Sequence, residues 1–270
     1  MISGRRRFIQ NAAGLLIPAA ALGVPAIARP QIFHGPVAHS AGANLLTSLI
    51  SFWELEESSG TRVDAHGSND LTDNNTVTSN TGKVGTCAQF TEANDEFLSH
   101  ADTASLQTGD INFTYCAWIY IDSIANTFPR VIDKASVTGG ALLYVRQENS
   151  RVTFAALDSG GGVAVEVLST DALSTATWYF LCAWFQADGA GPWTEDNCYV
   201  SINDGTPDNA AQTAAPAAGN QTFRIGGNDV ANRNWDGRMD QFGFWKRVLT
   251  QDEITWLYNS GNGRAYAELG

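Results

Sequence analysis

The sequence predicts an all-β fold, an antiparallel sandwich or barrel with one short helix near the C-terminus. Three observations predict it. Side chains alternate with a period of two along Asn112–Ile121, further strand-like runs recur between Gly, Asn and Asp turns, and one helical pattern follows Thr250. Many short strands at regular spacing are typical of a sandwich or a barrel.

Length and composition fit one ordered domain. The 270 residues are 44% apolar, enough for a sizeable core. Charged residues make up only 16%, against about 25% in an average soluble chain. This balance argues against disorder, a coiled coil and a helical repeat.

The charge is acidic, with 28 Asp and Glu against 16 Lys and Arg. Three of the arginines belong to the leader described next, so the remaining chain carries 13 − 28 = −15. A phosphate backbone would be repelled, so nucleic acid is not an expected partner. No apolar run reaches the ~18 residues of a membrane helix, so no integral membrane span is expected.

Residues 1–28 have the architecture of an export leader. Arg5–Gln10 (RRRFIQ) precedes an uncharged stretch that ends in Ala26-Ile27-Ala28, with small residues suited to signal peptidase. The start resembles a twin-arginine signal, which implies export to the periplasm or outside the cell and a mature start at Arg29. The alternative is an N-terminal arm that anchors the protein in a larger assembly.

Residues 29–43 are rich in Pro and Gly and have no apolar period, so we expect a linker before a domain at 44–270. Within that domain, Asn112–Ile121 is expected to be a central strand because both of its faces are largely apolar. The other expected strands are Arg130–Lys134, Ala141–Gln147, Arg151–Leu157, Gly162–Leu168, Thr177–Gln186, Cys198–Asn203, Thr222–Ile225 and Arg238–Trp245.

The helix begins with a capping box. Thr250 can accept a hydrogen bond from the first turn and Glu253 can reach back to it, while Ile254, Leu257 and Tyr258 follow at helical spacing. The helix should end within residues 259–261.

Several of these segments together resemble a known family. They are Phe113–Tyr120, Trp178–Phe185, Cys198–Gly205, Trp235–Gly261 and the opening stretch Phe52–Gly60 with Asp64. They look like laminin G-like and pentraxin domains of the concanavalin A-like class over residues 49–261. The resemblance implies an antiparallel jelly-roll sandwich and a non-catalytic module that binds glycans or proteins.

Glycoside hydrolases share this fold and use two carboxylates flanking the bond that is cut. The acidic clusters are Glu54, Glu56 and Glu57, and Glu92, Asp95 and Glu96. Neither has the alternating spacing that the resemblance implies for jelly-roll glucanases. Catalysis is therefore the third hypothesis, and no catalytic residue is assigned.

Calcium is the cofactor that the resemblance implies. Pentraxin-like domains hold it with residues that match Asn94, Asp95, Asn228 and Asp229, whose oxygens suit a hard cation. Asp64 and Asp240 match a second, structural ion site. Turn chemistry is the alternative for all of them, since Asn and Asp also cap loops without a metal.

Trp193 is the aromatic candidate for a sugar contact. It lies in a polar loop, Gly189–Asp196, where we expect its ring to be exposed. With Asn94 and Asp95 it makes up the predicted ligand-binding set. The core should hold five other tryptophans, namely Trp118, Trp178, Trp184, Trp235 and Trp245.

The four cysteines allow three pairings. Pentraxins bridge the strands that match Cys116 and Cys182, so the resemblance implies that disulfide and leaves Cys87 and Cys198 unassigned. Four buried thiols remain the alternative for a protein assembled in a reducing compartment.

The leading hypothesis is thus an exported, non-catalytic module that binds a glycan or a cell-surface polymer, with calcium as a possible cofactor. The second is a bacteriophage virion protein that adheres to its host, with the N-terminal arm anchored among virion partners. Neither the ligand, the source nor the oligomeric state follows from the sequence.

Overall fold

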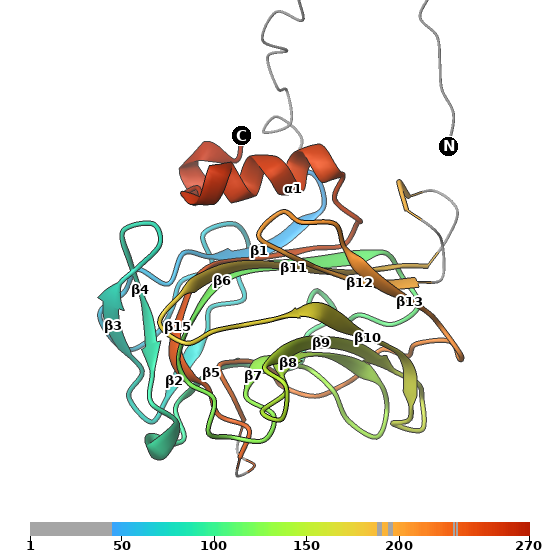
Figure 1. Cartoon of the computed structure of the whole chain (residues 1–270), viewed down its shortest axis with the longest axis horizontal. Coiled ribbons are helices and arrows are strands. Elements are labelled where there is room, and N and C mark those ends of the chain that lie inside the picture. Colours follow the sequence, from blue (N-terminus) through green and yellow to red (C-terminus); the bar gives the residue numbers. More distant parts are fainter. Residues whose placement is uncertain (1–44, 188–190, 194–196, 229, 231) are drawn as a thin grey trace, which may run out of the picture. The chain divides into compact units, whose positions relative to one another are not determined.

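A computed structural model describes residues 45–187, 191–193, 197–228, 230 and 232–270. The predicted leader, linker and first domain residue lie outside this range. Among the described residues, two antiparallel sheets stack face to face, with one α-helix over the outer face of one of them (Figure 1). The predicted sandwich is therefore confirmed.

The first sheet has eight strands and contains the predicted central strand, β6. Its order is β13 (Asp208–Ala211), β12 (Asn197–Ile202), β11 (Trp178–Gln186), β6 (Phe113–Ser123), β15 (Asp236–Trp245), β4 (Thr86–Phe90) and β3 (Thr78–Thr81), and β1 (Leu49–Trp53) also pairs with β15. A bulge divides β15, so that β4 pairs with its first half and β1 with its second.

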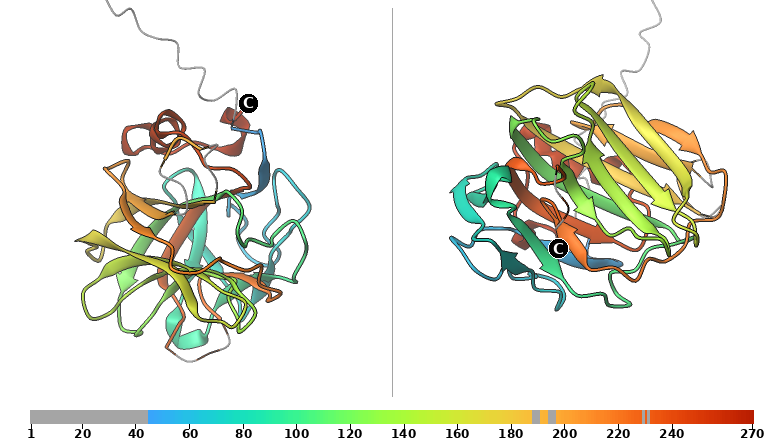
Figure 2. Two further views of the ribbon diagram at one scale, coloured as in Figure 1. Left: turned by 90° about the vertical axis from the view of Figure 1, so that its right-hand side faces the viewer. Right: turned by 90° about the horizontal axis from the view of Figure 1, so that it is seen from below.

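The second sheet has seven strands (Figure 2). Its order is β10 (Val163–Ala172), β9 (Arg151–Leu157), β8 (Gly140–Val145), β7 (Arg130–Asp133), β14 (Phe223–Ile225), β5 (Phe97–His100) and β2 (Thr72–Asn74). Every strand expected from the sequence is present to within a few residues. The short strands β2, β3, β4, β5 and β13 were not predicted from the pattern, since three to five residues are too few to show a clear alternation.

The helix α1 (Gln251–Tyr258) is the one predicted, and its capping box forms. Glu253 N donates to Thr250 Oγ1 at 3.3 Å, and Thr250 N donates to Glu253 Oε2 at 2.9 Å. Asn259 ends the helix in the left-handed conformation. Short 3-10 turns occur at Glu92–Asn94, Asn259–Gly261 and Tyr266–Glu268. No helix in the described part is long and apolar enough to cross a membrane.

Two apolar cores result. The main core lies between the sheets and includes alternate residues of β6, namely Phe113, Tyr115, Ala117 and Ile119. The second lies between the eight-stranded sheet and α1, where Trp118, Trp184 and Trp245 meet Ile254 and Leu257. This second core explains why β6 is apolar on both faces. Trp178 was also expected in the core, but this prediction was wrong, because its side chain is only half-buried and packs against Tyr120.

Candidate functional site

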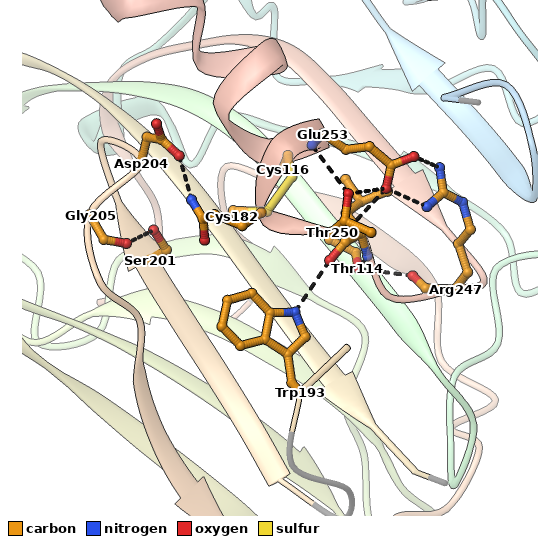
Figure 3. The surroundings of a disulfide bond; sticks show 12 residues. Thr114, Cys116, Cys182, Trp193, Ser201, Asp204, Gly205, Arg247, Thr250 and Glu253 are labelled. Carbon is orange, nitrogen blue, oxygen red and sulfur yellow. Dashed lines mark hydrogen bonds and ion pairs between the residues drawn. A yellow bond between two sulfur atoms is a disulfide. The ribbon is translucent and has the colours of Figure 1, made fainter. Parts of the chain in front are cut away.

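Trp193 packs onto the outer face of the eight-stranded sheet. Its backbone N donates to Gln186 Oε1 at 3.0 Å, and Gln186 Nε2 donates to its carbonyl at 2.5 Å, so the last residue of β11 holds the loop. Its indole N–H donates to the carbonyl of Leu249 at 3.3 Å (Figure 3). Trp193 is thus held by two hydrogen bonds to its backbone and one from its indole ring.

The ring of Trp193 caps an aromatic stack. Trp184 and Tyr199 face each other across β11 and β12, with ring centroids 5.0 Å apart and planes 6° from parallel. Trp193 lies 4.9 Å from Trp184 and 5.6 Å from Tyr199. The expectation that this ring has little to pack against was wrong. The ring is half-buried, while the two rings beneath it are fully covered.

Two pockets meet at Trp193, and we call them together the Trp193 groove. One measures about 460 Å³ and the other about 440 Å³, and both are shallow and open to solvent. Both are lined by Trp193, Thr206 and Pro207. Tyr199 and Asn209 belong to the first pocket, and Asp204, Gln251 and Thr255 to the second.

The polar wall of the groove is set by a tight turn after β12. Asn203 and Asp204 both have positive φ, 54° and 61°, and Gly205 N donates to Ile202 O at 3.0 Å, as in a type I′ turn. Asp204 Oδ1 then accepts from Gln251 Nε2 at 2.6 Å and from Thr255 Oγ1 at 2.9 Å, so two side chains of α1 hold it. A flat apolar ring and a fixed carboxylate thus line one groove.

The loops predicted to hold calcium do come together, through a residue that the sequence analysis did not select. Asn234 Nδ2 donates to Asp95 Oδ1 at 2.6 Å, and Asn234 Oδ1 accepts from Asn228 N at 3.0 Å. Asn228 Nδ2 donates to Asp133 Oδ2 at 2.5 Å. Asn94 bonds to Glu96 at 2.8 Å instead. Asp229 lies outside the described residues.

This chain of contacts consists of hydrogen bonds in which amide N–H groups face the carboxylates. A calcium ion requires oxygens to converge on it, so both amides would have to turn. Among the described residues no three His, Cys, Asp or Glu side chains are grouped to hold a metal. The arrangement therefore does not present a calcium ligand set, and calcium at these loops stays a prediction.

Asp64 and Asp240 each organise a loop of their own. Asp64 accepts from the backbone N of Phe52 at 3.0 Å and of Asn69 at 3.0 Å. Asp240 Oδ2 accepts from the backbone N of Lys83 at 2.7 Å and of Val84 at 2.9 Å, while its buried Oδ1 accepts no hydrogen bond from the residues that the structure describes. No contact between described residues joins the two carboxylates. Burial raises the pKa of Asp240 to about 7.

Three carboxylates of the acidic clusters considered for catalysis accept backbone hydrogen bonds, two from nearby residues and one from the start of β4. Glu56 accepts from Thr86 N at 2.7 Å, Glu57 from Val63 N at 2.7 Å, and Glu96 from Thr91 N at 2.7 Å. These contacts give the three carboxylates structural roles in the described part of the chain.

The predicted disulfide between Cys116 and Cys182 is confirmed. The two residues are direct partners on β6 and β11, with Cα atoms 4.3 Å apart. This Cα–Cα distance is close to the ~4.5 Å of a non-hydrogen-bonded residue pair in an antiparallel sheet. The bridge is buried beneath α1 (Figure 3). Cys87 and Cys198 are buried free thiols, and burial raises the pKa of Cys87 to about 12.

Comparison with solved structures shows the same fold in binding domains. The binding domain of Paraclostridial mosquitocidal protein 1 has a TM-score of 0.65 at 16% identity, over 80% of this chain and 53% of that one. The botulinum neurotoxin serotype D binding domain has 0.59 at 14%, over 78% and 51%. A Trypanosoma rangeli sialidase has 0.54 at 14%, over 81% and 34%. This chain thus spans about half the length of the two binding domains.

A comparison with curated protein sequences finds no match. A laminin G-type family model, described as the concanavalin A-like lectin/glucanases superfamily, matches residues 92–255, more than half of the chain. The two stacked antiparallel sheets and the structural likenesses agree with that match. The chain belongs to the concanavalin A-like lectin/glucanases superfamily.

Proposed function

We propose that this protein is a non-catalytic module that binds a saccharide in the Trp193 groove. The observation that carries the proposal is the position of Trp193, which is held by two backbone hydrogen bonds and one indole hydrogen bond and lines both halves of the groove. A rigid aromatic ring offers a large contact area at low cost in conformational entropy. The toxin binding domains of the same fold are consistent with a binding role.

The groove supplies the two kinds of contact that a sugar requires. The face of Trp193 can pack against the C–H groups of a pyranose ring. Asp204, Asn209 and Thr206 can exchange hydrogen bonds with hydroxyl groups, and Asp204 is already held by Gln251 and Thr255. Because these groups are in place before the ligand arrives, little ordering is required on binding.

Replacing Trp193 with alanine should abolish most of the binding. Truncation of a central aromatic contact costs about 2 kcal/mol or more, which corresponds to about thirtyfold weaker binding. A glycan array on the wild-type chain identifies the ligand, and calorimetry then compares the variants. Trp256→Ala is the matched control, since Trp256 is also half-buried but does not line the groove. Equal affinity in wild type and Trp193→Ala would overturn the proposal.

The same calorimetry tests calcium. With Asn94 and Asp95 as predicted ligand-binding residues, binding through the metal would be lost in chelator and in Asp95→Ala. Binding through the groove alone would persist in both. The two routes are therefore separated by comparing Asp95→Ala with Trp193→Ala, each with calcium and with chelator.

We further propose that the protein is exported. The Cys116–Cys182 bridge supports an oxidising compartment, where disulfides persist. Processing after Ala28 should then remove residues 1–28 in the native host, and the intact mass checks this. A mass that retains Met1–Ala28 would contradict export by cleavage and favour the alternative, a virion protein with an N-terminal anchor.

Release of reducing ends from a bound polysaccharide would support the third hypothesis, a hydrolase.

A further inference from the structure

A second pocket, of about 310 Å³, lies on the other sheet. Ala141, Leu143 and Val145 of β8 face the main core, so Leu142 and Tyr144 face outward, and Leu142 lines the pocket. The pocket is therefore on the outer face of the seven-stranded sheet, with both sheets and the main core between it and the Trp193 groove. We call it the Arg130 pocket.

Arg130 is a buried cation whose hydrogen bonds are incomplete. It begins β7, is 5% exposed and lines the pocket. Its Nε and Nη1 atoms have no hydrogen-bond partner among the described residues. The guanidinium carbon lies 4.5 Å from the centre of the Tyr144 ring, a cation–π contact that supplies no acceptor. A buried cation whose hydrogen bonds are incomplete is costly, so an added acceptor and negative charge in the pocket would be favourable.

The nearest carboxylate, Asp133, forms an ion pair with this cation but accepts no hydrogen bond from its Nε. Asp133 Oδ2 lies 3.5 Å from Arg130 Nε, outside hydrogen-bond geometry, and the same oxygen accepts from Asn228 Nδ2 at 2.5 Å. The chain Asp95–Asn234–Asn228–Asp133 described above therefore positions Asp133, the one acid among the described residues that line the pocket. Arg146, on the same face, differs because it is paired with Glu166 at 2.5 Å.

The described charged residues that line the pocket leave an excess of positive charge. Arg130 and Arg233 are opposed by Asp133 alone. Arg233 O accepts from Arg130 N at 2.9 Å, which keeps the two residues adjacent. This local excess occurs in a chain with a net charge of −12. Val137, Leu142 and Leu157 form an apolar wall beside the two arginines.

We propose that the Arg130 pocket binds the carboxylate of a small acidic ligand. Arg130 and Arg233 supply the counter-charge, since guanidinium groups match a planar carboxylate in both charge and geometry. The apolar wall covers the carbon skeleton that carries the acid. This second site is independent of the saccharide proposed for the Trp193 groove.

The test is to titrate the full chain with glucuronate, glucose and acetate and to monitor binding by NMR chemical-shift perturbation. Glucuronate should bind and glucose should not, because only the former carries a carboxylate. If the carboxylate alone is sufficient for binding, acetate should displace glucuronate from the pocket. If acetate does not displace glucuronate, the carbon skeleton contributes to the contact. Both outcomes support the pocket. Glucose and glucuronate shifting the same residues equally, or no binding of either acid, would overturn it.

Variants locate the site. Arg130→Gln should weaken glucuronate binding at least about tenfold, and Arg233→Gln about threefold, as expected for loss of a hydrogen-bonded charge and of a neighbouring charge. Arg238→Gln is the matched control, since Arg238 also stacks on a tyrosine at 4.5 Å but bonds to Gln89 and lies outside the pocket.

Unchanged binding in Arg130→Gln would contradict the assignment. If Arg130→Gln does not fold, Arg233→Gln and Arg130→Lys carry the test, and unchanged binding in both would likewise contradict it. Trp193→Ala should keep full glucuronate binding, so failure at this pocket is distinguishable from failure at the groove.

Discussion

Replacing Cys116 and Cys182 with alanine is expected to lower the free energy of unfolding by about 4 kcal/mol. The bridge closes a loop with a sequence separation of 66 residues. In the chain-entropy model, loss of such a loop returns about that much freedom to the unfolded chain. Because it joins the middle of β6 to β11 and lies beneath α1, its loss also loosens the second core.

Denaturant unfolding checks this expectation, and the chain supplies its own control. Cys87→Ala with Cys198→Ala removes two buried thiols that form no bridge. This double variant should lose only the stability that comes from packing two sulfur atoms. The difference in the free energy of unfolding between the two double variants therefore measures the contribution of the bridge. Wild-type stability that is the same with and without reductant, when reduction of the bridge is confirmed by mass, would show that the bridge contributes nothing.

Asp240 should make the protein less stable as the pH rises from about 4 to about 7. Burial raises its pKa in the folded state from 3.8 to about 7, so over this range the unfolded chain loses a proton that the folded chain keeps. Its stabilising contribution is complete below pH 4 and is lost as the pH passes through 7. At about 1.4 kcal/mol for each pH unit, the loss is on the order of 4 kcal/mol.

Asp240→Asn should remove this slope. The amide keeps an oxygen to accept from the backbone N–H groups of Lys83 and Val84 but has no proton to lose. Unfolding measured between pH 4 and 8 in chelator should therefore show the wild type losing stability relative to the variant as the pH rises. Parallel curves would mean that Asp240 does not titrate in this range. Flattening of the wild-type slope by added calcium would support the predicted ion at this residue.

The sequence predicted well what depends on local pattern. The alternation of Asn112–Ile121 identified β6, and the capping box at Thr250 and Glu253 located α1, because both signals lie within a few residues. The five short strands were missed because pairing with neighbours, rather than their own pattern, makes them strands. The disulfide followed from family resemblance, since spacing alone leaves three pairings open.

The candidate sites were predicted only in part, since they depend on contacts between distant residues. Trp193 was selected, but its packing on Trp184 and Tyr199 required the register of β11 and β12. Asn234 was missed because its role depends on the Asp95 loop, 139 residues away in sequence. Arg130 gave no signal, since an arginine at the start of a strand is usually solvated, and only its burial distinguishes it.

The central claim is that a saccharide binds against the ring of Trp193. The most direct measurement is the set of indole N–H resonances of the eight tryptophans, with that of Trp193 assigned from Trp193→Phe. On addition of an oligosaccharide that binds on the array, we expect the Trp193 signal to shift most, while the signals of the buried indoles of Trp53, Trp118 and Trp235 stay in place. A saturable interaction that leaves the Trp193 signal unmoved would contradict it.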